Sequence, residues 1–315
     1  MLNRTKLWIA AIAVVIAVAI GGGNTALAAA PRGPCGDSLT QGIPARAEDA
    51  PGGQAFAEQI RGLSDEERET QIRRELRAGN IPNFLRQLVP IRLQSPLLDG
   101  KLVDIIVCAA PDYLAIGSDD DFLMIPMRLA TALATASEYG FTLPTTQLVD
   151  AIYAQAAVHF VPQPLPAGNE MRSTDYSLRH NDLIAAQRAA LGVSLGALSA
   201  GDKKDLVLTN RLRDHLDRVA IYGWHTADGK PIQSLSTVHG WRYADYSHGA
   251  RLISTQVFID GKPRSIFEIM QDSRLAGALS KEGVVSDVLG LIKNLNTQAQ
   301  ATIAAIVPTL RPRFP

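Results

Sequence analysis

The sequence lacks the charge imbalance that marks many binding proteins. Its 31 basic and 31 acidic residues give a formal net charge of zero, and no run of Lys and Arg occurs along the chain. Proteins that bind nucleic acids or anionic membranes through charge carry a basic patch or stripe. We therefore expect no nucleic-acid partner and no electrostatic attachment to a membrane surface.

Signature spacings for metal ions are missing as well. No His-Glu-x-x-His, Cys-x-x-Cys or His-x₃₋₅-His spacing occurs, and these are the spacings typical of zinc sites. Only two cysteines, Cys35 and Cys108, are present. In an exported protein they permit one disulfide, and the alternative is that Cys108 is simply buried in an apolar strand.

Long hydrophobic runs are confined to the N-terminus. Leu7–Ile20 is an unbroken apolar run that follows Arg4 and Lys6, and small residues follow it as far as Ala30. This layout predicts a secretory signal peptide over residues 1–30, with an uncleaved anchor as the alternative. Cleavage would leave 29 basic and 31 acidic residues, a net charge of −2. We expect a secreted or periplasmic protein with no membrane span after cleavage.

The remaining chain divides by composition and periodicity. Residues 31–54 are rich in Pro, Gly and Ala and predict a loose lead-in. Residues 55–283 are long enough for a single α+β domain, with N-terminal helices packed on a mainly antiparallel sheet. Residues 284–315 predict a C-terminal helical arm, because the segment is amphipathic and has no evident partner in the domain. One helix is expected to begin after Ser64, and the other expected helices are Pro126–Tyr139, Pro144–Ala156 and His180–Leu191. The expected strands are Val89–Leu93, Lys101–Ala109, Asp205–Thr209, Arg218–Trp224 and Arg251–Ile259.

One stretch, Tyr222–Arg251, concentrates the residue types that carry chemistry. It holds three of the six histidines and three of the seven tyrosines. Imidazoles titrate near neutral pH, and aromatic side chains with polar tips suit partly buried, wet surfaces. The stretch therefore indicates a functional site, the alternative being a hydrogen-bonded structural loop.

Roles within this site follow from residue type. We expect His225, His239 and His248 to share acid/base or ligand duty, since general acid/base catalysis uses groups that titrate near the working pH. We expect Asp245 or Asp205 to orient an imidazole. We expect Lys204 and Arg251 to stabilise negative charge. The aromatic residues expected to form a platform for sugar or peptide are Tyr222, Trp224, Trp241, Tyr243 and Tyr246.

A zinc site and a serine nucleophile are alternatives. The His239 and Asp245 pair resembles the paired His and Asp of secreted zinc endopeptidases that cut cell-wall peptides, but the interval and the order of the other histidines depart from that family. The cofactor is therefore left unknown, with a metal not favoured. Ser247 is a candidate nucleophile, but adjacent residues of a strand face opposite ways, so His248 would not serve it.

Five runs of sequence resemble a group of secreted bacterial proteins. The resemblance covers roughly residues 80–285, and it implies that these residues form one domain without implying an activity. The runs are Pro111–Asp119, Leu143–Thr145, Lys203–Val207, Val219–His225 and Tyr243–Gly249.

The function expected from these features is hydrolysis of an envelope or extracellular polymer, either glycan or peptide, by histidine acid/base chemistry. The main alternative is a non-enzymatic domain that binds glycan or peptide on the aromatic platform. A structural envelope protein that docks through Val284–Val307 is the third possibility.

Overall fold

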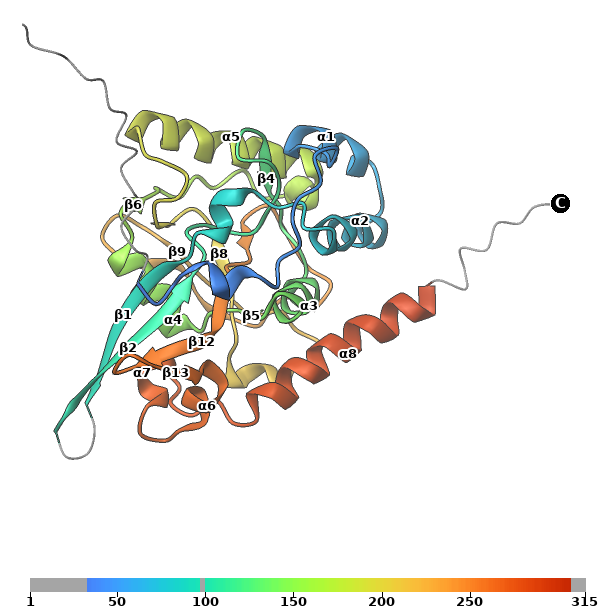
Figure 1. Ribbon diagram of the computed structural model, residues 1–315. Coiled ribbons are helices and arrows are strands. Elements are labelled where there is room, and N and C mark those ends of the chain that lie inside the picture. The colour runs from blue at the N-terminus through green and yellow to red at the C-terminus, as the bar shows by residue number, and fades with distance from the viewer. Residues whose placement is uncertain (1–32, 97–99, 307–315) are drawn as a thin grey trace, which may run out of the picture. The chain divides into compact units, whose positions relative to one another are not determined.

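Helices and mainly antiparallel strands make up the described part of the chain (Figure 1). The computed structural model describes residues 33–96 and 100–306, and the expected signal peptide lies outside them. The expected α+β class is confirmed, since helices occur together with a multi-strand antiparallel sheet and a helix lies at the C-terminal end.

The elements have the following bounds. The helices are α1 Gly53–Ile60, α2 Asp65–Arg77, α3 Leu129–Tyr139, α4 Thr146–Gln155, α5 Thr174–Leu191, α6 Ile266–Gln271, α7 Ala276–Leu279 and α8 Val288–Ile306. The strands are β1 Val89–Pro96, β2 Leu102–Ala109, β3 Ala115–Gly117, β4 Phe122–Met124, β5 Phe141–Thr142, β6 Val158–His159, β7 Ser199–Ala200, β8 Lys204–Leu206, β9 Ile221–His225, β10 Pro231–Ser236, β11 His248–Gly249, β12 Ile253–Ile259 and β13 Lys262–Ser265.

Two sheets organise most of the strands. The larger has the order β1-β2-β12-β13, with β5 paired to β12, and its pairs are antiparallel. The smaller has the order β10-β9-β8-β11, and it is antiparallel except between β8 and β11. The expected strands Val89–Leu93 and Lys101–Ala109 are present as β1 and β2, which pair antiparallel with Val89 opposite Ala109.

Local sequence signals explain several helix ends. Ser64 caps α2 and forms a capping box with Glu67, as expected from a serine followed by acids. Gly140 ends α3 in the left-handed conformation at φ 82°, where glycine has no steric penalty. The predicted start of α5 at His180 is wrong, because Ser173 caps the helix and it begins at Thr174.

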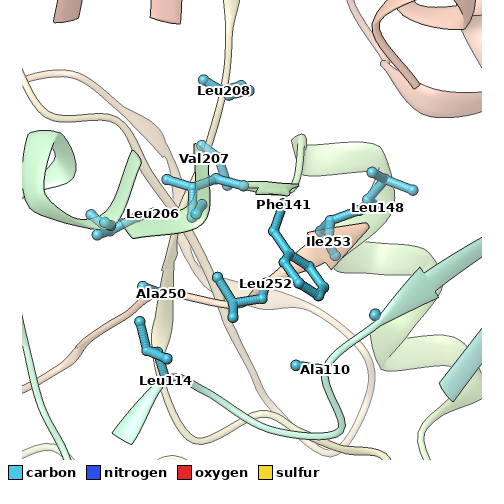
Figure 2. Close-up of a cluster of buried hydrophobic side chains, with 14 of the residues drawn as sticks. Ala110, Leu114, Phe141, Leu148, Leu206, Val207, Leu208, Ala250, Leu252 and Ile253 are labelled. Carbon is cyan, nitrogen blue, oxygen red and sulfur yellow. The ribbon is translucent and has the colours of Figure 1, made fainter. Parts of the chain in front are cut away.

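Apolar side chains from both sheets and α4 meet in a buried cluster (Figure 2). Leu206 of β8 and Ile253 of β12 are fully buried in it, and Leu148 of α4 packs into the same core. Burial of apolar side chains contributes about 1.5–3 kcal/mol for each large residue. This core holds β8 firmly, and β8 carries the polar residues described below.

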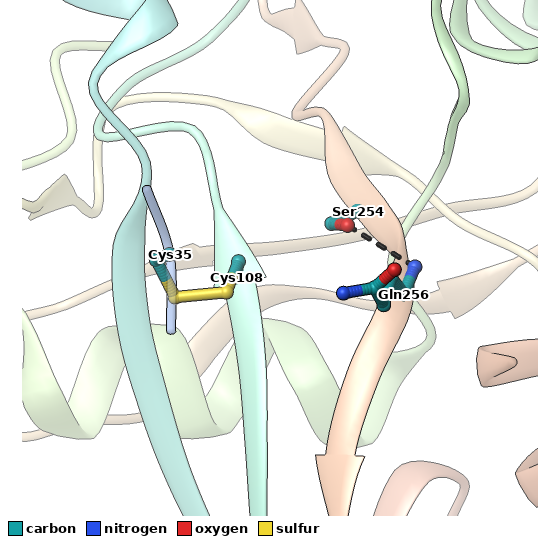
Figure 3. The surroundings of a disulfide bond; sticks show 4 residues. All are labelled: Cys35, Cys108, Ser254 and Gln256. Carbon is teal, nitrogen blue, oxygen red and sulfur yellow. Dashed lines mark hydrogen bonds between the residues drawn. A yellow bond between two sulfur atoms is a disulfide. The ribbon is translucent and has the colours of Figure 1, made fainter. Parts of the chain in front are cut away.

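The segment predicted as a loose lead-in is held in place by specific bonds. Cys35 forms a disulfide with Cys108 on β2, with the two Cα atoms 5.5 Å apart (Figure 3). The Arg46 guanidinium donates to Asn80 Oδ1 at 2.9 Å and to the Ala50 carbonyl at 2.6 Å. The disulfide possibility is thus the one realised, and residues 33–52 are attached to the domain.

The C-terminal helix has a partner in the domain, contrary to the expectation for residues 284–315. Val288, Leu291 and Leu295 of α8 are buried in the main apolar core, and α8 contacts α3 and α6. The amphipathic pattern therefore reflects packing within the domain over this part of the helix. Within the described ranges, no helix combines the length and the apolar character needed to cross a bilayer.

Candidate functional site

Strand β8 separates two groups of polar side chains. In register, Lys204 lies opposite Gly223 of β9 on one side and opposite His248 of β11 on the other. Asp205 lies opposite Tyr222. Because successive side chains of a strand point to opposite faces, Lys204 and Asp205 serve different faces of this sheet.

In β9 the usual alternation of side chains between the two faces of the sheet is interrupted at Gly223 and Trp224. Gly223 and Trp224 have positive φ angles of 109° and 57°. A positive φ is rare for a residue as bulky as Trp, and such conformations persist where the surroundings enforce them. As a result Tyr222 and His225 bond the same carboxylate, whereas the Trp224 ring contacts Tyr246 instead.

One group, which we call the β8–β11 site, consists of Lys204, His239, Tyr243, Asp245 and His248. The His239 ring stacks on Tyr243 with centroids 4.1 Å apart, and the Tyr243 hydroxyl donates to Asp245 Oδ2 at 2.9 Å. The distance from His248 Nε2 to Asp245 Oδ2 is 3.9 Å. The structure therefore brings together four of the six expected catalytic residues.

The charges in the β8–β11 site are set by burial and by neighbours. Burial lowers the pKa of His248 to about 4, although the Asp245 carboxylate acts in the opposite direction. Burial acts to raise the pKa of Asp245, but His248, the Ser247 hydroxyl and Lys204 outweigh it, and the pKa is lowered. At neutral pH a neutral imidazole therefore lies beside an ionised carboxylate.

Several polar groups in this region have no partner. Both ring nitrogens of His248 are buried without a hydrogen bond among the described residues. The Lys204 ammonium, half-buried, has no hydrogen bond or ion pair within the same ranges and lies 5.2 Å from the centre of the Trp224 ring. Buried polar groups are normally bonded in native structures, so this concentration marks the region as a candidate site.

Lys203, the neighbour of Lys204, is completely buried. Its ammonium lies 3.1 Å from Nδ1 of His180 on α5 and donates to the Tyr246 carbonyl at 2.6 Å. Burial lowers the pKa of Lys203 to about 8 and that of His180 to about 2. Lys203 is thus a cation in the interior at neutral pH, whereas His180 is neutral.

The second group, which we call the Asp150 cluster, contains His225. The Asp150 carboxylate accepts from His225 Nε2 and from the Tyr222 hydroxyl, each at 2.9 Å, and also from the Lys281 ammonium. Burial acts to raise the pKa of Asp150, but these three donors lower it overall. The His225 ring stacks on Tyr153 at 4.5 Å. The expectation that three imidazoles share one cleft is wrong, because the reversal in β9 turns His225 toward Asp150, away from the β8–β11 site.

Arg251 and Asp205 belong to the interior. Arg251 is 1% exposed and donates to the carbonyls of Ala110 and Ser199 at 3.0 and 2.8 Å. Asp205 accepts from the Tyr113 hydroxyl at 2.8 Å, and burial raises its pKa to about 6. Asp205 also lines a cavity of about 10 Å³ with His225, too small for more than one water-sized molecule. Arg251 and Asp205 therefore bond to other groups of the protein interior.

The expected aromatic platform is only partly present. Trp224 and Tyr246 are buried, and Tyr222 faces Asp150. The partly exposed members are Trp241 and Tyr243. The guanidinium groups of Arg242 and Arg128 lie 4.8 and 6.0 Å from the Trp241 ring centre, so the available platform is smaller and more cationic than expected.

Sequence reasoning missed four polar residues of these groups: Asp150, His180, Lys203 and Lys281. Asp150 lies in an apolar helical pattern, and only its position within α4 relates it to β9. The adjacent lysines 203 and 204 were a weak signal, since a charged turn before a strand is ordinarily solvated.

A serine motif also occurs in the chain. Residues 192–196 read Gly-Val-Ser-Leu-Gly, which has the spacing of a nucleophile elbow. An elbow requires a turn from a strand into a helix. Here the run follows α5, with Gly192 as the cap of that helix, and precedes β7. The structural context of a nucleophile is therefore missing.

Comparison with known proteins assigns no relationship. No family model, no curated protein and no solved structure matches the chain significantly. Across residues 33–96 and 100–306, no group of three or more His, Cys, Asp or Glu side chains is arranged to hold a metal ion.

Proposed function

We propose that the protein is an exported hydrolase of an envelope or extracellular polymer and that the β8–β11 site carries its acid/base chemistry. The observation that carries the proposal is the environment of His248, whose two ring nitrogens are buried without hydrogen-bond partners among the described residues. An ionised Asp245 lies 3.9 Å away, and Lys204 is its register partner on β8. Perturbed titratable groups gathered in this way are typical of catalytic sites.

The three groups suit distinct steps of a hydrolysis. His248 takes a proton from water while the water oxygen bonds to the electrophilic carbon, and it then gives that proton to the leaving amine or alcohol. Asp245 stabilises the intervening imidazolium, as a carboxylate does beside a catalytic histidine. Lys204 stabilises negative charge that develops on the substrate oxygen.

The partly exposed rings of Trp241 and Tyr243 supply contact with the polymer. His239 stacks on Tyr243 and holds its ring beside Asp245. Flat aromatic faces contribute large contact areas at low cost in side-chain entropy. In this proposal His239 positions Tyr243.

A binding module is the second candidate, favoured by the surroundings of Trp241. Two arginines lie near this ring, and Arg128 is held by Glu66 through both guanidinium ends, at 2.5 and 2.8 Å. A cation beside a partly exposed aromatic ring, here the exposed Arg242, can bind an acidic glycan or peptide without any turnover.

Turnover and binding should be measured separately. The purified protein is incubated with peptidoglycan, a neutral polysaccharide and an unfolded polypeptide, and released reducing ends and amino groups are quantified. We expect His248→Gln to lower turnover by about 10²–10⁴-fold while binding survives. His215→Gln, at an exposed histidine, is the matched control.

Two outcomes would reject the enzyme. One is a folded His248→Gln variant with the turnover of the parent. The other is binding without turnover on all three polymers, lost in Trp241→Ala, which would establish the binding module.

Export is tested by the mass of the mature N-terminus, expected to begin after Ala28 or Ala30.

A further inference from the structure

Two buried N–H groups that border the β8–β11 site have no acceptor among the described residues. The oxygens of Asp202 also lack a partner within those ranges, but that carboxylate interacts with Asp112 and Arg251. The obvious acceptor, Asp245, already accepts on both oxygens. Oδ1 accepts from the backbone N–H and the hydroxyl of Ser247 at 2.8 and 2.5 Å, and Oδ2 accepts from Tyr243. A buried donor without an acceptor is costly, so the donors left over require an explanation.

The first such donor is the indole N–H of Trp224. Indole nitrogen only donates, and among the described residues Nε1 has no partner although the side chain is buried. The Lys204 ammonium lies 5.2 Å from the centre of this same ring. A neutral donor and an unpaired cation therefore occur side by side.

The second donor is Nε2 of His180. An ammonium only donates, so the Lys203 contact makes Nδ1 the acceptor and places the proton of the neutral imidazole on Nε2. Within the described ranges Nε2 is buried without a partner. The His180 and Trp224 rings meet edge to face, with centroids 6.1 Å apart. Two orphan N–H groups thus lie on neighbouring rings.

The charges in the β8–β11 site also indicate an anionic ligand. Arg172 lies 5.7 Å from the centre of the Tyr243 ring and is paired with Asp65. Lys204 has no such partner within residues 33–96 and 100–306. Asp245 is the acid that faces it, and its oxygens are engaged by Ser247 and Tyr243. A ligand group that carries negative charge and several acceptors would match these donors.

We propose that the β8–β11 site binds its substrate through an oxyanion, a carboxylate or a phosphate, with Lys204 as the charged contact and Trp224 Nε1–H as a neutral donor. The proposal rests on the proposed function for the reaction performed there. The binding itself is independent of turnover. Charge-assisted hydrogen bonds to an oxyanion are about twice as strong as neutral ones, so Lys204 determines specificity for acidic over neutral substrates.

Indole ¹H–¹⁵N resonances provide a direct readout. The chain has three tryptophans, and Trp224→Phe identifies the Trp224 signal while retaining an aromatic ring. The purified protein is titrated with acetate, with inorganic phosphate and with acetamide as the neutral analogue of acetate. We expect the Trp224 signal to move with an oxyanion, with a Kd on the order of millimolar for such small probes, and to stay fixed with acetamide.

Substitution of Lys204 tests the charged contact. Lys204→Met should weaken oxyanion binding about tenfold, as expected for loss of one charge-assisted bond, and Lys204→Arg should restore most of it. Lys262→Met, at an exposed lysine that begins β13, is the matched control and should bind like the parent. Because Lys204 is half-buried and its side chain has no hydrogen bond among the described residues, the variants should fold.

Each outcome of the titrations either supports or overturns the proposed oxyanion site. Movement with acetate alone establishes a carboxylate site, and movement with phosphate alone establishes a phosphate site. Equal response to acetamide, no response to either oxyanion, or an unchanged response in Lys204→Met overturns the proposal. If oxyanion binding depends on Lys204 but turnover ignores His248, the anion site stands and the proposed hydrolase fails.

Discussion

The ammonium of Lys203 and the imidazole of His180 form a buried contact of 3.1 Å, although each group alone would be unfavourable in the interior. The second bond from Lys203, to the Tyr246 carbonyl, completes its environment. This contact links α5 to the residue just before β8, a central strand of the small sheet, and it sets the tautomer of His180. Its energetic role is testable, because a second lysine follows directly in the chain.

Lys203→Met should destabilise the protein by about 2 kcal/mol, since it leaves the His180 nitrogen and a buried carbonyl without a donor. Lys204→Met should cost less than about 1 kcal/mol, because its cation–π contact is half-exposed. Urea unfolding of both variants measures the difference. Equal loss in the two variants would show that the buried contact has no special weight.

Asp205→Asn should flatten the dependence of stability on pH between about 4 and 6. The folded pKa, raised to about 6, lies above the unfolded value of 3.8. Asp205 therefore stabilises the fold below pH 4, and this contribution is lost as pH rises through 6. The shift corresponds to about 3 kcal/mol. Unfolding free energies at pH 4 and 7 test this, with Asp214→Asn at an exposed site as control.

His248→Gln should alter the pH dependence in the opposite sense. The folded pKa of about 4 lies below the unfolded value of 6.5. His248 therefore stabilises the fold above pH 6.5, and this contribution disappears as pH falls through 4. Acid unfolding followed by circular dichroism should begin at lower pH in the variant. An acid transition unchanged from that of the parent would contradict the assigned burial effect.

Replacing both Cys35 and Cys108 with serine should lower the unfolding free energy by about 4 kcal/mol. The disulfide spans 73 residues, and closing so long a loop restricts the unfolded chain strongly. Comparing the parent under oxidising and reducing conditions gives an independent measurement. A loss below about 1 kcal/mol in both experiments would mean that contacts such as those of Arg46 suffice to hold the segment.

Much of the fold was predictable from short-range signals. Ser64 followed by acids predicted the start of α2, and Gly140 predicted the end of α3, because caps depend on neighbouring residues only. The packing of α8 was not predictable, since an amphipathic pattern shows that an apolar face exists without naming its partner.

The site was predictable in composition and only partly in geometry. Asp205 was expected to orient an imidazole, and it lines the same small cavity as His225. The separation of His225 from His248 depends on a positive φ at Trp224, for which the sequence carries no signal beyond the preceding Gly223. Burial of Arg251 also depends on the tertiary fold, because its carbonyl partners at positions 110 and 199 are distant in sequence.

The reversal at Gly223 and Trp224 also limits how the protein can evolve. A side chain at position 223 would require φ near 109° and would meet Asp205 Oδ2 at 3.3 Å. A backbone change that relieved this would reorient Trp224 and His225 together, since they are adjacent on one short strand. A change in the β9 backbone that is favourable on one face of the sheet therefore also alters the other face. We expect sequence changes that alter binding to occur on α4 and α5, while the β9 backbone is retained.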